Sequence, residues 1–282
     1  MSTQSTAIIT GEQITHAVST QVRNYIGQGE LQLPLNYSAE NALRSAMLAL
    51  PDIKNMNKEP VLKACTQESI KGALLDMCIQ GLNPAKKQCY FIAYGSKLVM
   101  QRSYFGEIAV AKAVNPNVEE IYPEVVFEGD KFDYVIKRGK IVEINHSQKI
   151  ENKDKKIVAA YATIIYRDGS EESIVMTWDQ IKKSWSKSQQ APIDANGNLN
   201  PKTTHGLYPE EMAKRTVVRK ACKPIINNSN DSNLMVQYIK KSTDNNDAIE
   251  VDVEIEENAN AIDIPAEFVE DEEPVVEEKE PF

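Results

Sequence analysis

The residues whose type and spacing point to chemistry are two clusters of basic side chains. Residues 182–223 contain nine Lys or Arg and three Asp or Glu, and residues 86–112 contain five basic residues and one acid. Clustered cations neutralise phosphates and release the counterions that a nucleic acid holds. The clusters therefore predict two walls of one DNA groove, or else two unrelated solvated faces.

The later cluster has the clearer geometry. At 100° per residue, a helix over residues 209–222 places Arg215, Arg219 and, if the helix continues, Lys223 on one face, which suits a row of phosphates. Four apolar residues fall on the opposite side: Ala213, Val217, Val218 and Ala221. Lys214 falls within this apolar arc, either with its ammonium reaching the surface or held in a pocket, so its role stays open.

A shorter helix expected over residues 178–187 adds candidate phosphate contacts at Lys182, Lys183 and Lys187. An apolar stripe on another face of this helix favours core packing over base stacking: Trp178, Ile181 and Trp185.

In the earlier cluster, basic, polar and aromatic side chains alternate just after a predicted hairpin. Such a mixture can hold a DNA backbone and stack on bases. The candidates are Lys97, Gln101, Arg102 and Tyr104. Core packing is the alternative for Tyr104 and its neighbour Phe105.

Motifs for nucleotide hydrolysis or covalent catalysis do not occur in the sequence. A phosphate-binding loop needs G-x-x-x-x-G-K-[ST], and before Gly139-Lys140 the first required glycine is replaced by Tyr134. The four cysteines form no C-x-x-C pair, which favours reduced thiols over a zinc or redox site. Asp130 and Asp133 are more simply turn and strand-edge residues than metal ligands. We therefore expect no required cofactor, ATP included, and leave Mg²⁺ dependence open.

Periodicity and turn signals predict an α+β fold, with β-hairpins and an antiparallel sheet packed against helices to form a basic DNA groove. We expect helices over residues 11–27, 38–50, 66–80, 104–114, 178–187, 209–222 and 232–241. We expect strands over residues 88–94, 97–101, 118–127, 132–136, 158–166 and 171–176, with turns at 95–96, 128–130 and 167–170 and a polar loop over 188–207.

The charge distribution separates a basic body from an acidic tail. The chain carries a net charge of −9, but residues 242–282 hold sixteen acids and one base, which leaves residues 1–241 with a net charge of +6. A segment so rich in acids cannot bury enough apolar surface to fold alone, so we expect a disordered tail. Its alternating stretch, residues 249–255, could form a strand against a partner. The tail could compete with DNA for the groove, recruit a basic partner, or only aid solubility.

Several strings closely resemble the RecT family of phage and prophage annealing proteins. They are Ile79-Gln-Gly-Leu-Asn-Pro84, Tyr90-Phe-Ile-Ala-Tyr-Gly95 and Leu98-Val-Met-Gln-Arg-Ser-Tyr104, followed in the same order by Glu128-Gly-Asp-Lys-Phe-Asp-Tyr134 and Met212-Ala-Lys-Arg-Thr-Val-Val-Arg-Lys220. The similarity covers roughly residues 35–225. The family often has proline where this chain has Ala93.

The resemblance implies ATP-independent binding of single-stranded DNA and annealing to a complementary strand, giving an annealed duplex. It also implies a homo-oligomer, as a ring or helical filament, and a 5′→3′ exonuclease partner; a host single-strand binding protein is a further candidate. We then expect an N-terminal helical and oligomerisation segment (1–34), a DNA-binding annealing core (35–241) and the tail (242–282).

An oligomeric adaptor protein and a metal-dependent nuclease remain the alternatives. No run of eighteen apolar residues and no secretory leader is present, so we expect a cytoplasmic protein without a membrane partner.

Overall fold

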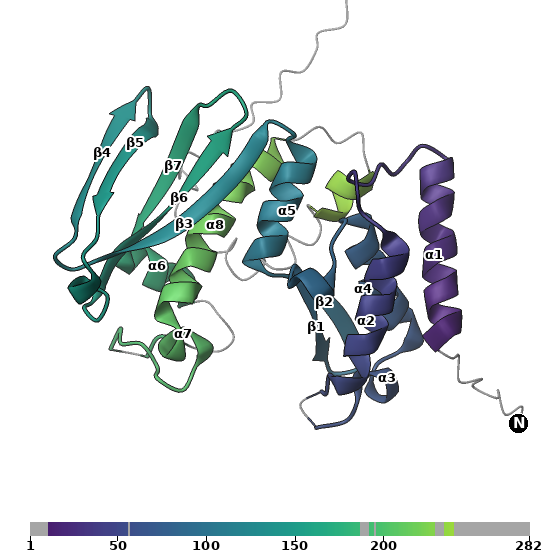
Figure 1. The fold of residues 1–282 in the computed structure, drawn as a ribbon. Helices are drawn as coiled ribbons and strands as arrows, with labels where there is room; N and C mark the ends of the chain where they lie inside the picture. Colours follow the sequence, from purple (N-terminus) through teal and green to yellow (C-terminus); the bar gives the residue numbers. More distant parts are fainter. Residues whose placement is uncertain (1–10, 56, 187–191, 195, 229–233, 240–282) are drawn as a thin grey trace, which may run out of the picture.

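The computed structural model describes residues 11–55, 57–186, 192–194, 196–228 and 234–239. Helices and two antiparallel sheets make up this part of the chain, which confirms the α+β class (Figure 1). The expected acidic tail, residues 242–282, lies outside the described residues. Among the described residues, no helix combines the length and apolar character needed to cross a membrane.

Three of the N-terminal helices lie where local signals predict them, and a short fourth helix over residues 61–64 was not predicted. The helices are α1 (Gly11–Gly27), α2 (Ala39–Ala49), α3 (Val61–Ala64) and α4 (Gln67–Ile79), with short 3₁₀ turns at Leu50–Asp52 and Pro84–Lys86. Ser38 caps α2 by accepting a hydrogen bond from the Asn41 N–H, and Thr66 caps α4 through the Ser69 N–H. Gly81, with φ of +68°, ends α4 in the left-handed conformation that glycine adopts without strain.

The hairpin of β1 (Cys89–Tyr94) and β2 (Lys97–Arg102) has two unlike faces. Its pairing places Tyr90 opposite Gln101 and Tyr94 opposite Lys97. Side chains alternate across a strand, so these four residues share one face, which is half-buried to exposed. The other face is buried and packs on α4, so the hairpin holds its polar side open.

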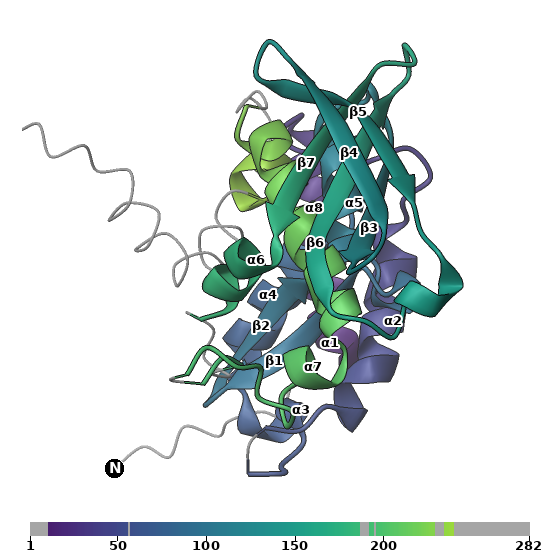
Figure 2. The same ribbon diagram turned by 90° about the vertical axis from the view of Figure 1, so that its left-hand side faces the viewer.

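A five-stranded antiparallel sheet forms the second half in the order β3-β6-β7-β5-β4. Its strands are β3 (Val118–Phe127), β4 (Lys131–Lys137), β5 (Lys140–Ser147), β6 (Ile157–Tyr166) and β7 (Glu171–Thr177), with a 3₁₀ turn at Ile150–Asn152. Strand β5 was not predicted, because its residues mix polar and apolar types. Figure 2 shows β4 and β5 crossing in front of β6 and β7, so the sheet curls strongly.

The 128–130 turn does not join two paired strands. Strand β3 pairs with β6, and β4 pairs with β5, so the two strands flanking the turn form opposite edges of the sheet. The turn itself is present, with Gly129 at φ of +91°. The 167–170 hairpin between β6 and β7 is confirmed.

The remaining helices cover the sheet: α5 (Tyr104–Val114), α6 (Trp178–Trp185), α7 (Thr204–Leu207) and α8 (Pro209–Asn227). A capping box between Thr177 and Gln180 opens α6. Helix α8 packs on β6 and β3 and continues past Pro224, so its predicted end at residue 222 is wrong. Its length keeps Lys223 within the helix. A short helix over residues 234–239 follows, and α7 interrupts the expected 188–207 loop.

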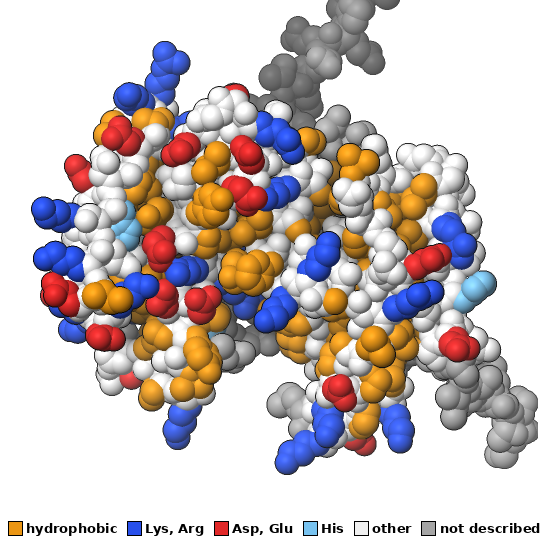
Figure 3. Space-filling view, viewed as in Figure 1, with side chains coloured by type: hydrophobic (Ala, Val, Ile, Leu, Met, Phe, Trp, Pro, Cys, Tyr) orange, Lys and Arg blue, Asp and Glu red, His pale blue; other side chains and the backbone are white. Residues whose placement is uncertain are grey.

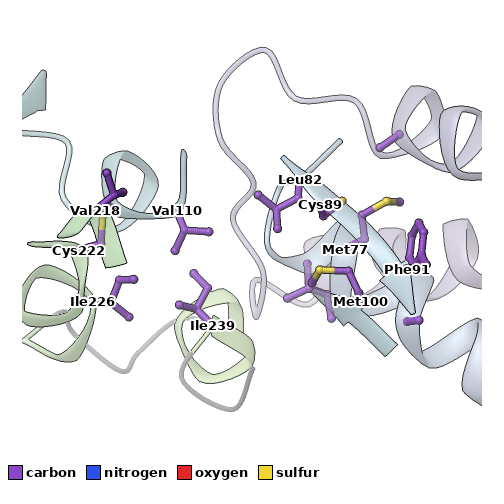
Figure 4. Close-up of a cluster of buried hydrophobic side chains, with 14 of the residues drawn as sticks. Met77, Leu82, Cys89, Phe91, Met100, Val110, Val218, Cys222, Ile226 and Ile239 are labelled. Carbon is purple, nitrogen blue, oxygen red and sulfur yellow. The ribbon is translucent and has the colours of Figure 1, made fainter. Parts of the chain in front are cut away.

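One core runs through both halves of the chain (Figure 4). Met77, Phe91 and Met100 line it on the side of the hairpin, and Val218 and Cys222 of α8 line it on the side of the five-stranded sheet. Because the same core contacts the hairpin and α8, the two elements with the clustered basic residues are held at fixed positions.

Candidate nucleic-acid interface

The two basic clusters meet through one side-chain hydrogen bond. The Arg215 Nη2 of α8 donates to the Tyr90 hydroxyl of β1 at 2.9 Å, across 125 residues of sequence. Tyr90 lies on the open face of the hairpin. The basic face of α8 and the open face of the hairpin are therefore adjacent.

The open face of the hairpin is itself ordered. Gln101 Nε2 donates to the Tyr94 hydroxyl at 2.9 Å, which lays the Tyr94 ring along the strands. Tyr94 remains 46% exposed, and Lys97 is exposed beside it. We name Tyr90, Tyr94, Lys97, Gln101 and Arg215 the hairpin–helix surface. It combines two cations with two aromatic rings, the pairing suited to phosphates and stacked bases.

Helices α6 and α7 support α8 next to Arg215. Trp185 of α6 is buried, and its Nε1 donates to Thr216 Oγ1 at 2.8 Å. The His205 ring of α7 lies edge-on to Trp185, with 4.8 Å between centroids. The core interpretation of the tryptophan stripe is confirmed for Ile181 and Trp185, which are buried, and Trp178 packs partly buried against the same core.

His205 is a buried histidine beside a cation. Burial lowers its pKa, and the charge of Arg215 lowers it further. Its Nδ1 has no hydrogen-bond partner within the described part of the chain. The lowered pKa favours a neutral imidazole, which adds no charge repulsion beside Arg215.

The prediction that Arg102 contacts DNA is wrong, because the side chain is completely buried. Its Nε lies 3.1 Å from Glu107 Oε1, and its Nη1 donates to Gln80 Oε1 at 2.8 Å and to the Ile239 carbonyl at 3.3 Å. The alternation of β2 explains the error: Gln101 faces outward, so its neighbour must face the core. Arg102 joins β2 to α4, α5 and the 234–239 helix.

Lys214 already has two carboxylate partners within the protein. Its ammonium lies 2.9 Å from Glu210 and 3.1 Å from Glu124, and 18% of the side chain is exposed. Burial alone would lower the pKa of Lys214, but the hydrogen bonds that its ammonium donates to Glu210 and Glu124 outweigh burial and raise the pKa. Two carboxylates already compensate this charge, so Lys214 fixes α8 to β3.

The remaining predicted DNA contacts differ in their exposure and in their partners. Lys182 is paired with Asp179 at 3.1 Å, and Lys183 is exposed on the same helix. Arg219 and Lys223 are half-buried on α8, further along from Arg215, and Glu211 stands one turn before Arg215. Lys187 lies outside the described residues.

Of the two interpretations of Tyr104 and Phe105, core packing and DNA contact, each residue fits a different one. Tyr104 packs against the core, and burial raises its pKa. Its ring centroid lies 4.0 Å from that of Phe105, which is 46% exposed. Core packing therefore holds for Tyr104, and Phe105 is the ring of the pair with an accessible face.

Sequence reasoning missed three residues at this place: Tyr90, Tyr94 and His205. The alternation of β1 could have identified the tyrosines, since both fall on the face opposite the apolar Phe91 and Ala93. No local signal identifies His205, because its environment comes from α6 and α8.

Asp130 belongs to a polar network of hydrogen-bonding side chains. Its carboxylate accepts hydrogen bonds from Asn152, Gln148 and the Phe127 N–H, and His146 Nε2 lies 3.2 Å away. Burial alone would raise the pKa of Asp130, but these hydrogen bonds, led by that from Asn152, lower it to about 2. Among the described residues, no group of three or more His, Cys, Asp or Glu side chains is arranged to hold a metal ion.

Comparison with known proteins identifies the family. The RecT family profile matches residues 40–260 of this chain. This chain belongs to the RecT family. It is similar to Protein RecT of Escherichia coli (strain K12), with 29% identity over 201 residues, covering 68% of each chain. The RecT resemblance stated from the sequence is thereby confirmed, and with it a role in DNA recombination.

Proposed function

We propose that this protein binds single-stranded DNA on the hairpin–helix surface and anneals it to a complementary strand without ATP. The observation that carries the proposal is the Arg215–Tyr90 hydrogen bond, which joins cations from two distant segments to one aromatic face. RecT-family membership supports the same activity.

The mechanism is electrostatic rather than covalent. Lys97 and Arg215 neutralise phosphates and release counterions, which lowers the repulsion between two strands. The exposed ring of Tyr94 stacks on bases without reading their sequence. Sequence specificity then comes from base pairing between the strands, because the protein leaves the pairing edges open.

In this proposal the species that anneals DNA is an oligomer, which forms either a ring or a helical filament. Repeating one weak site along a strand raises overall affinity through multivalency. A 5′→3′ exonuclease supplies the single strand, and a host single-strand binding protein is a second partner.

The test mixes complementary oligonucleotides carrying a fluorophore and a quencher with the full-length protein, without ATP. We expect faster quenching than without protein, and suppression of the gain by added salt. Lys97→Ala with Arg215→Ala should remove most of the gain. Lys149→Ala is the matched control, because Lys149 is exposed in the loop after β5.

Two results would contradict the proposal. A folded protein that assembles but gives no acceleration would support the adaptor alternative. Shortening of labelled DNA that requires Mg²⁺ would support the nuclease alternative.

A further inference from the structure

The five-stranded sheet has two edges of opposite charge. Edge strand β3 contains Glu119, Glu120 and Glu124, no basic residue, and Pro123 within the strand. The other edge strand, β4, begins and ends with Lys131 and Lys137, and Arg138 follows in the turn. Figure 3 shows several Lys and Arg side chains along the left-hand edge of the molecule, where β4 and β5 lie. Within the described residues, these three cations form no ion pair.

The backbone of β4 is accessible for pairing. The Tyr134 N–H donates to the Asp133 carboxylate at 3.0 Å. In an antiparallel ladder alternate amides point away from the partner strand, so Tyr134 presents its N–H to the open edge. That N–H is held by a side chain of its own strand, which an added strand would displace, whereas on the β3 edge the Val125 carbonyl accepts a hydrogen bond from Gln148, a residue from the loop after β5.

Strand β4 also has an incomplete apolar face. Phe132 packs against Tyr134, His146 and Tyr161, with ring centroids 5.5–5.9 Å apart. Tyr134 is 42% exposed and Ile136 is 59% exposed. A strand placed beside β4 with aliphatic residues on this side would extend the aromatic layer and cover the two exposed side chains.

One segment of this chain has the matching pattern. Residues 249–255 read Ile-Glu-Val-Asp-Val-Glu-Ile, with aliphatic residues at every second position and an acid at each position between. As a strand, the segment has one aliphatic face and one face of three carboxylates. The lysines of β4 repel a basic strand, including β4 of a second copy, but they attract an acidic strand.

We propose that residues 249–255 of one copy add as a strand to the free edge of β4 in a neighbouring copy. The reach of the chain favours a neighbour. The 234–239 helix is bonded to Glu30 and Arg102, to the right of α5 in Figure 1, whereas β4 lies at the far left. Residues 240–248 span at most about 33 Å. Four strand spacings alone take roughly 19 Å, before the chain passes around the helices.

The test uses thiol cross-linking in the full-length chain, because the four native cysteines are buried. A copy with Asp133→Cys and a copy with Asp252→Cys, carrying tags of different size, are co-expressed and treated with a short thiol cross-linker. We expect a cross-linked heterodimer several-fold above that formed when Glu119→Cys on β3 replaces Asp133→Cys. Lys131→Glu with Lys137→Glu should abolish the product, and adding Glu250→Lys with Glu254→Lys should restore it.

Four outcomes would overturn the proposal. They are a yield equal to the control, a stronger product with the β3 cysteine, a product insensitive to charge reversal, and cross-linking only within one chain when both cysteines are placed in the same copy. Circular dichroism of each variant confirms that the body is folded.

Discussion

Arg215 and Tyr90 lie 125 residues apart in the sequence, and a hydrogen bond of 2.9 Å joins them. The bond links a helix that packs on the five-stranded sheet to a hairpin that packs on the N-terminal helices. It explains how two basic segments form one surface. Arg215 thus has two roles in the proposed function: it contacts a phosphate, and it links the two halves of the protein. Mutations that remove one role and keep the other can distinguish them.

Arg215→Ala should weaken binding of single-stranded DNA and reduce the slope of log affinity against log salt by about one. Tyr90→Phe removes the hydrogen-bond acceptor but keeps both the ring and the cation, so the salt slope should stay unchanged. Fluorescence anisotropy at several salt concentrations measures both effects. Equal slopes for wild type and Arg215→Ala would show that Arg215 makes no phosphate contact.

Arg102→Ala should lower the free energy of unfolding by about 3–5 kcal/mol, because it leaves Glu107 as an uncompensated buried charge. Replacing both partners, Arg102→Met with Glu107→Leu, should recover part of the loss, because Gln80 and the Ile239 carbonyl still lose the Arg102 donor. Urea unfolding of the two variants gives the comparison. A loss of DNA affinity without a loss of stability in Arg102→Ala would return Arg102 to the set of DNA contacts.

Asp130 should make stability depend on acidity. Its pKa in the folded chain is about 2, below the ordinary value of 3.8, so its contribution is fully present above pH 3.8. That contribution is lost as pH falls through about 2, since folding then no longer favours the ionised form. Asp130→Ala should cost about 1–3 kcal/mol at neutral pH, by leaving buried donors without an acceptor. It should also flatten the acid limb of the stability profile, and an unchanged limb would refute this role.

Two helical glycines should respond oppositely to alanine. A Cβ at Gly72 of α4 meets nothing within 4 Å, so Gly72→Ala should stabilise the protein by about 0.5–1 kcal/mol. A Cβ at Gly106 of α5 would lie 2.1 Å from the Gln88 carbonyl oxygen. Gly106→Ala should therefore destabilise the contact between α5 and the hairpin. Thermal melting of the pair tests this, and a shared sign would contradict the packing at Gly106.

The sequence by itself determined the elements that depend on neighbouring residues. The caps at Ser38 and Thr66, the stop at Gly81 and the apolar side of α8 follow from interactions within about one helical turn. The basic character of α8 and of the hairpin follows from composition. These features can be predicted from the sequence because the conformation of each residue there depends mainly on its neighbours along the chain.

Only the tertiary structure decided which strands pair and which charges are buried. The 128–130 turn is consistent with a hairpin, yet β3 pairs with the distant strand β6, and both strands pack on α8. Arg102 and Lys97 are both basic residues of one strand, but β2 turns one into the core and the other to the surface. The charge of a side chain follows from its residue type. Whether that charge is exposed to DNA depends on the residues that distant segments place around it.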